Sequence, residues 1–177
     1  SLPPMGIFTQ PEQWINGDLG ERMYLRYFLR EIRRKRVTRF DVINVSEESL
    51  TGYVAKNVTP LVQTFLKNGP DPKLAAKTDL SGANAYLGMM LHLETILPPE
   101  TFGRVLVLSG DRGPSALKAV TLAVDEKATL KLNLGGMKGQ RVWIPVGNHK
   151  VVGATVAKRM GAWSQVVPTG DTVTLQR

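Results

Sequence analysis

The chain has 177 residues, of which 42% are hydrophobic and 21% are charged, and this composition is typical of an ordered globular domain rather than a disordered chain. It contains no cysteine, which excludes disulfides, cysteine nucleophiles and thiolate metal sites. Its 23 Lys and Arg outnumber 15 Asp and Glu and give a net charge of +8, an excess that favours a polyanionic partner.

The N-terminal part of the chain divides into an arm and the start of a domain. Residues 1–17 contain three prolines and predict an irregular arm, whereas residues 18–177 predict one domain. Asp18 and Glu21 form a capping box, and the apolar residues that follow recur at helical spacing. An amphipathic helix is therefore expected from Asp18 to about Arg36.

Three further helices are predicted before the middle of the chain. A short strand around residues 40–45 precedes a helix capped by Ser46 and another helix that begins at Pro60. Segment 68–73 is rich in proline and glycine, which predicts an exposed loop or an internal linker. The helix from Ser81 to about Leu97 has apolar residues on more than one face, so we expect it to be buried.

Beyond Pro99 the hydrophobic pattern changes from helical to alternating, which predicts an antiparallel meander. The predicted strands are 105–108, 120–124, 130–134 and 141–146. Segment 148–160 predicts a helix, although its β-branched residues also suit a strand, and residues 172–175 predict an edge strand. The predicted fold class is α+β, with a mainly helical N-terminal half and an antiparallel β-meander in the C-terminal half followed by a helix.

These patterns also predict which side chains form the core. The apolar faces of the helices and of the meander are expected to bury Leu25, Phe28, Ile32, Tyr86, Met89, Leu93, Leu122, Leu132 and Ile144. No window reaches the roughly 18 uncharged apolar residues that a membrane span requires, so a soluble protein is expected and an intracellular location is favoured.

A row of arginines on the first helix is the strongest functional signal. The row consists of Arg22, Arg26, Arg30 and Arg33, and it continues through Arg34, Lys35, Arg36 and Arg39. Like charges four residues apart repel, so helix stability does not explain the row. Arginine's planar donors suit phosphate, and Tyr24 and Tyr27 offer stacking surfaces nearby. The row predicts an exposed polyanion contact, and the alternatives are ion pairs within the fold or an acidic membrane surface.

A second basic group lies in the C-terminal half. It comprises Lys131, Lys138, Arg141, His149, Lys150, Lys158 and Arg159. Loop 135–140 contains three glycines and is expected to be exposed and mobile, with backbone donors that could follow a phosphate chain. A hairpin loop without a ligand is the alternative. Lys138, Arg141 and Lys150 are the candidate nucleic-acid contacts of this group.

The sequence nominates no catalytic or metal centre. His92 flanks an apolar helix face and predicts a hydrogen-bonded structural histidine, while His149 beside Lys150 is expected to be exposed. No acidic pair accompanies either histidine at ligand spacing, so neither a metal nor a cofactor is expected. Catalytic motifs such as a nucleophile elbow are missing from the sequence, and an enzyme is therefore not the expected class.

The leading hypothesis is a non-enzymatic nucleic-acid-binding subunit of a ribonucleoprotein, replication or viral assembly, with RNA favoured over DNA. It would contact phosphates through the basic helix and the basic glycine-rich loop. The second hypothesis is a scaffold or coat-like assembly protein with acidic protein partners, and the third is an enzyme acting on a phosphate-bearing substrate. A homo-oligomer or a larger assembly is compatible with each.

Overall fold

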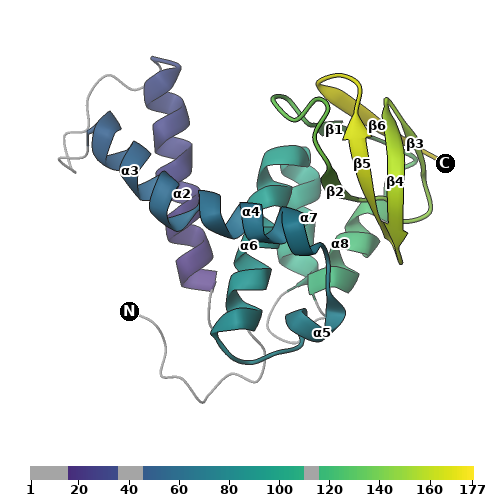
Figure 1. Cartoon of the computed structure of the whole chain (residues 1–177), viewed down its shortest axis with the longest axis horizontal. Coiled ribbons are helices and arrows are strands. Elements are labelled where there is room, and N and C mark those ends of the chain that lie inside the picture. The colour runs from purple at the N-terminus through teal and green to yellow at the C-terminus, as the bar shows by residue number, and fades with distance from the viewer. Residues whose placement is uncertain (1–15, 36–45, 110–115) are drawn as a thin grey trace.

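The computed structural model describes residues 16–35, 46–109 and 116–177 (Figure 1). The predicted arm lies outside this part of the chain apart from its last two residues. The strand predicted around 40–45 also lies outside it. In chain order the helices are α2 (Asn16–Arg33), α3 (Glu47–Asn57), α4 (Thr59–Asn68), α5 (Pro72–Ala75), α6 (Leu80–Ile96), α7 (Pro99–Leu108) and α8 (Ala116–Asp125). The strands are β1 (Thr129–Asn133), β2 (Val142–Pro145), β3 (Lys150–Val152), β4 (Ala154–Met160), β5 (Trp163–Pro168) and β6 (Thr172–Gln176). The α+β class is confirmed.

Local sequence signals fix the starts of several helices. The Ser46 side chain accepts a hydrogen bond from the Ser49 backbone N–H and caps α3, as predicted. Pro60 lies in the first turn of α4, where its missing N–H has no helical partner to lose. Asp79 caps α6 by accepting from the Gly82 N–H. These capping side chains begin each helix by satisfying a backbone donor that the helix itself leaves free.

Helix α6 is the centre of the helical part and is buried on more than one face, as predicted. Met90, Leu91 and Leu93 are fully buried, although they point in different directions around the helix. Gly88 allows α4 to approach closely, because a Cβ atom at this position would lie 2.3 Å from the Leu61 carbonyl oxygen. The packing of α6 therefore depends on both apolar surface and the absence of one side chain.

The strands predicted at 105–108 and 120–124 are wrong, because these segments belong to the helices α7 and α8. In α7 the buried residues Phe102 and Val105 are three apart, and in α8 Val120 and Val124 are four apart. These spacings are helical, and the two helices pack against each other. The alternation that suggested a strand included Leu122, which is 41% exposed and does not belong to the core.

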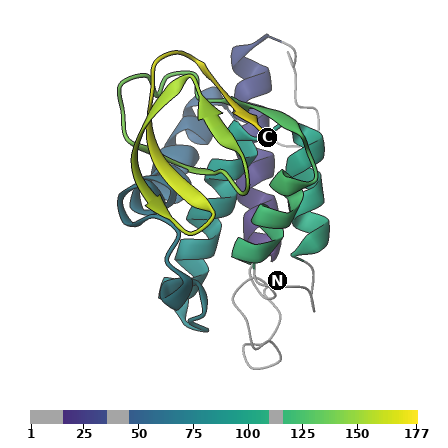
Figure 2. The same ribbon diagram turned by 90° about the vertical axis from the view of Figure 1, so that its right-hand side faces the viewer.

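The C-terminal third forms two antiparallel three-stranded sheets, with strand orders β1-β6-β3 and β2-β5-β4. The strands lie to one side of the helical part in Figure 1, and in Figure 2 this side is turned toward the viewer. The helix predicted at 148–160 is wrong, because this segment forms β3 and β4. Gly153 separates the two strands with a φ of +91°, a conformation in which glycine is unstrained, and the chain passes from one sheet to the other there. Strand β6 is the middle strand of its sheet and not the predicted edge.

One hydrophobic cluster includes residues of the helices and of both sheets. Of the nine predicted core residues, five are buried, namely Tyr86, Met89, Leu93, Leu132 and Ile144. Leu25, Phe28 and Ile32 on α2 are only half-buried, because this helix lies at the periphery. The exposed loop predicted at 68–73 is buried at Gly69 and Pro70. A Cβ atom on Gly69 would lie 2.7 Å from the Trp143 ring, so this segment joins the helices to β2.

Candidate nucleic-acid interface

The predicted arginine row is not a free basic face. Arg26 Nη2 donates to Glu94 Oε2 at 2.5 Å and to the Leu91 carbonyl oxygen at 2.7 Å. Arg30 Nη2 donates to the same oxygen of Glu94 at 2.6 Å. Burial lowers the pKa of Arg26, an effect that Glu94 opposes by its negative charge. The expectation that this part of the row is exposed is therefore wrong, and these contacts join α2 to α6.

The two ends of the row also have partners within the chain. Arg22 Nε donates to the Asn57 carbonyl oxygen at 3.0 Å, which links α2 to the end of α3. Arg33 Nη2 donates to Thr51 Oγ1 at 3.1 Å, and its Nε lies 3.5 Å from Glu47 Oε1. Arg33 is nevertheless exposed, whereas Arg22 is half-buried. The alternative of ion pairs and hydrogen bonds within the fold accounts for the position of both residues.

The basic residues after the row remain at the surface where the structure describes them. Arg34 is exposed and its Nη1 lies 3.5 Å from Glu31 Oε1. Lys35 is exposed and has a φ of +56°, which ends the helical conformation. Arg36 and Arg39 lie outside the described residues. Arg34 and Lys35 are therefore accessible cations of this region, as Arg33 is.

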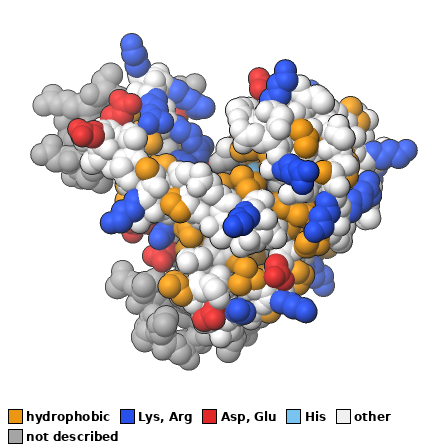
Figure 3. Space-filling model, in the orientation of Figure 1, with side chains coloured by type: hydrophobic (Ala, Val, Ile, Leu, Met, Phe, Trp, Pro, Cys, Tyr) orange, Lys and Arg blue, Asp and Glu red, His pale blue; other side chains and the backbone are white. Residues whose placement is uncertain are grey.

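A groove of about 520 Å³ lies between α2 and β1, and its floor is formed by the end of α6 and the start of α7. We call it the α2–β1 groove. Tyr27 and Arg30 line it from α2, Arg34 lines it just past the end of that helix, and Lys131 and Asn133 line it from β1. Two carboxylates, Glu31 and Glu94, line it as well. In Figure 3 the surface is hollowed between the region of α2 and α3 and the region of the strands, with Lys and Arg side chains gathered on the α2 side. The fold thus brings together cations from the two basic groups of the sequence.

The tyrosine of this groove has an exposed ring. Tyr27 and Tyr24 are each 51% exposed, and each contacts Phe28 edge-on, with ring centroids 5.9 Å and 4.3 Å apart. Tyr27 lines the groove, whereas Tyr24 is not among its lining residues. Tyr27 therefore has an accessible aromatic face beside cations, the combination that single-stranded nucleic acids bind.

Lys131 and Asn133 were not selected from the sequence as site residues. The alternation of Leu130, Leu132 and Leu134 places both on the solvent face of a strand, but nothing in it shows that α2 lies opposite. Asn133 Oδ1 accepts a hydrogen bond from the Gly135 N–H at 3.1 Å, which leaves its Nδ2 as the donor group. No carboxylate in the described part of the chain lies within 4.0 Å of the Lys131 ammonium group.

The glycine-rich loop is exposed, as predicted, except that Met137 is half-buried. Most of its backbone donors, however, are used within the chain and are not free for phosphate. The Met137, Gly139 and Gln140 N–H groups donate to the carbonyl oxygens of Leu134, Pro168 and Met137 at 3.0 Å each. The side chains of Lys138 in the loop and of Arg141 directly after it are exposed and therefore accessible to a polyanion.

The strand region carries most of the unbalanced positive charge. Between positions 126 and 177 there are eight Lys and Arg but two acidic residues. One of these, Glu126, forms an ion pair with Arg104 on α7, with Oε1 and Nε 2.9 Å apart. Lys150 is exposed on β3. The electrostatic attraction that the arginine row was expected to supply is therefore centred on the strands.

Both histidines are structural. His92 is fully buried on α6, and its Nε2 lies 2.8 Å from the Trp143 carbonyl oxygen. Burial lowers its pKa to about 4, so the ring is neutral near pH 7, as expected for a structural histidine. His149 is buried, and the prediction of its exposure is wrong because its ring nitrogens contact the Val146 and Lys127 carbonyl oxygens. Within the described ranges, no cluster of three or more His, Asp or Glu could hold a metal ion.

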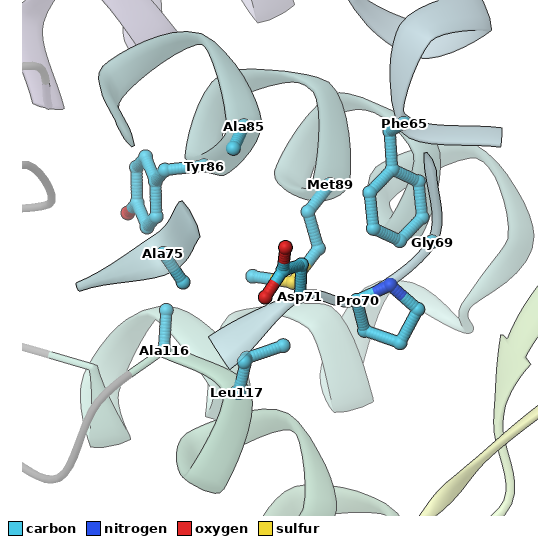
Figure 4. Close-up of a pocket in the computed structure, with 10 residues that line it drawn as sticks. All are labelled: Phe65, Gly69, Pro70, Asp71, Ala75, Ala85, Tyr86, Met89, Ala116 and Leu117. Atoms are coloured by element: carbon cyan, nitrogen blue, oxygen red, sulfur yellow. The ribbon is translucent and has the colours of Figure 1, made fainter. Parts of the chain in front are cut away.

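A second hollow lies between α4, α5, α6 and α8 (Figure 4). Its volume is about 30 Å³, which is space for about two water molecules and too small for a nucleotide. Phe65, Met89 and Leu117 give it an apolar lining. The one carboxylate there, Asp71, accepts a hydrogen bond from the Lys73 N–H and caps α5. This hollow has the character of a packing gap, and the α2–β1 groove is the better candidate site.

No helix among the described residues combines the length and the apolar character needed to cross a bilayer. Comparisons of the chain with family models, with curated proteins and with solved structures found no match.

Proposed function

We propose that this chain binds single-stranded nucleic acid, RNA in preference to DNA, in the α2–β1 groove. The observation that carries the proposal is the convergence of cations from two distant parts of the sequence on one groove that also exposes an aromatic ring. Arg34 is contributed by the end of α2, Lys131 by β1, and Tyr27 supplies the ring. Cations beside aromatic rings are how proteins hold single strands without reading their sequence.

The charges in the groove favour an anion after the internal ion pairs are counted. Among the lining residues Glu94 balances Arg30, and Arg26, which does not line the groove, pairs with the same carboxylate. Glu31 balances Arg34, whereas Lys131 adds a positive charge. The groove is therefore net positive, which suits a phosphate chain.

The shape of the groove favours a single strand over a duplex. Its volume of about 520 Å³ lies within the range of small-ligand pockets, about 300–1,000 Å³, so individual nucleotides could enter it. Proteins that read duplex DNA instead insert a protruding helix or ribbon into the major groove. A concave site with an exposed tyrosine therefore suits a single strand better than a duplex.

The binding test replaces the two accessible groove cations, Arg34 and Lys131, with glutamine. Labelled single-stranded RNA, single-stranded DNA and duplex are titrated over a salt series. On single strands the log–log slope of affinity against salt should fall by about 1.4, because each lost phosphate contact removes about 0.7. The matched control, Lys73→Gln with Lys118→Gln, removes the same charge from exposed sites outside the groove and should leave the slope nearly unchanged.

The stacking contact has its own matched pair of variants. Tyr27→Ala should weaken single-strand binding by about 1–3 kcal/mol without changing the salt slope, because a stacked base is lost and no phosphate contact is. Tyr24→Ala removes an equally exposed ring from the same helix outside the groove and should have little effect. Equal losses in the two variants would contradict the role of the groove.

The other hypotheses predict different outcomes of the same titration. An assembly protein with acidic partners would form a defined oligomer free of nucleic acid, and the wild type would show no affinity for any probe at low salt. An enzyme acting on a phosphate-bearing substrate would bind mononucleotides as tightly as oligonucleotides. Absence of single-strand binding at low salt would refute the proposal.

A further inference from the structure

The outer face of the β1-β6-β3 sheet is continuous with the α2–β1 groove. Lys131 and Asn133 line the groove and also point to this face, because they alternate with the buried Leu130 and Leu132. Lys131 lies opposite Thr174 of β6 in the sheet register. Directly opposed residues in an antiparallel pair point to the same side, so one surface runs from the groove across β6.

The same register carries this surface to the far strand, β3. Gln176 of β6 lies opposite both Thr129 of β1 and Lys150 of β3. Thr129, Gln176 and Lys150 therefore form a second row, beside the row of Lys131, Thr174 and Val152. We call the exposed side of these two rows the sheet face. Its polar side chains are hydroxyls, one amide and two lysines, without a carboxylate.

We infer that a bound single strand leaves the groove at Asn133 and continues across the sheet face to Lys150, and that this segment of the site distinguishes RNA from DNA. The inference rests on the proposed function. Lys131 and Lys150 lie on the two outer strands of the sheet, in neighbouring rows of the register. Usual strand spacings place their Cα atoms about 12 Å apart. The two lysines can therefore contact different phosphates of one strand.

The polar groups between the lysines suit the sugar of RNA. A hydroxyl or amide can donate to and accept from a ribose 2′-hydroxyl, which DNA lacks. Thr174 and Gln176 occupy the middle strand, between the two lysines in the register. The sheet face displays no aromatic side chain, so bases are not stacked there and sequence preference is weak.

Oligonucleotide length separates the groove from the sheet face. A series of oligouridines from 4 to 16 nucleotides is titrated against wild type, Lys150→Gln and the control Lys158→Gln, which removes an exposed lysine from β4 in the other sheet. Lys150→Gln should leave the shortest oligomer unaffected and lower the salt slope for the longest by about 0.7. Lys158→Gln should change neither.

Comparison of RNA with DNA gives a second measurement on the same proteins. The preference of the wild type for oligouridine over oligodeoxyuridine should increase with length, and Thr174→Val should reduce it for long oligomers alone, with thermal melts confirming that the variant is folded. If short and long oligomers bind but Lys150→Gln equals wild type at every length, the sheet face is not part of the site. If no oligomer binds, the proposed function itself fails.

Discussion

Replacing Glu94 with glutamine is expected to destabilise the protein by about 3 kcal/mol, because two arginines share this carboxylate. Two unit charges about 4 Å apart attract by about 4 kcal/mol at an effective dielectric constant near 20. The side chain of Glu94 is 16% exposed, so solvent screens part of this attraction. Removing one partner from a buried pair typically costs about 3–5 kcal/mol, and the lower end applies to Glu94 and its partner Arg30, which is partly exposed.

Urea unfolding followed by circular dichroism measures this loss directly. The matched control is Glu126→Gln, which breaks the surface ion pair with Arg104 and should cost no more than about 1 kcal/mol. Arg26→Gln should cost less than Glu94→Gln, because Arg30 still pairs with Glu94 in that variant. If Glu94→Gln and Glu126→Gln lower the free energy of unfolding equally, the arginines of α2 are not held by internal pairs and the exposed row of the sequence hypothesis is restored.

Three further results are expected. Gly88→Ala should lower the free energy of unfolding by about 2 kcal/mol or more, because its Cβ would lie 2.3 Å from the Leu61 carbonyl oxygen. The control Gly52→Ala, on the open side of α3, should be neutral or stabilising. Equal effects of the two variants would contradict the close packing of α4 on α6. Burial lowers the pKa of His92 to about 4 from its ordinary 6.5, so its contribution to stability is complete above pH 6.5 and is lost as the pH falls toward 4, up to about 3 kcal/mol. His92→Gln should therefore flatten this part of the stability profile, and an unchanged profile would show that the histidine is not buried as described. In the glycine-rich loop, hydrogen exchange should be slowed at the Gly139 N–H, which donates to a carbonyl oxygen at 3.0 Å. Exchange at the rate of an unstructured peptide would contradict this hydrogen bond and support the predicted mobility of the loop.

Local signals in the sequence determined the first half of the fold. The Ser46 cap and the proline in the first turn of α4 act through neighbouring backbone groups, so their effects do not depend on distant packing. The apolar residues on more than one face of α6 likewise indicated its burial before any partner was known. The alternation of Leu130 and Leu132 on β1 places Lys131 and Asn133 on the solvent-facing side for the same reason.

Short apolar segments in the second half were decided by tertiary packing. Residues 105–108 and 120–124 fit both a helical and an alternating pattern, and the packing of α7 on α8 selects the helix. Segment 148–160 contains helix-compatible spacing, yet Gly153 and the pairing with β5 and β6 make it two strands. Intrinsic preferences in such segments are small compared with the burial that a neighbouring element offers.

The candidate site shows the same division between local and long-range information. The sequence revealed an excess of cations and which of them share a helix, because charge and helical spacing are local properties. It could not reveal that Glu94, more than 60 residues away, neutralises part of the arginine row, nor that Lys131 faces Arg34 across a groove. Ion pairs and grooves form between elements that meet only in the folded chain, so the tertiary structure alone decides which cations are left to bind a partner.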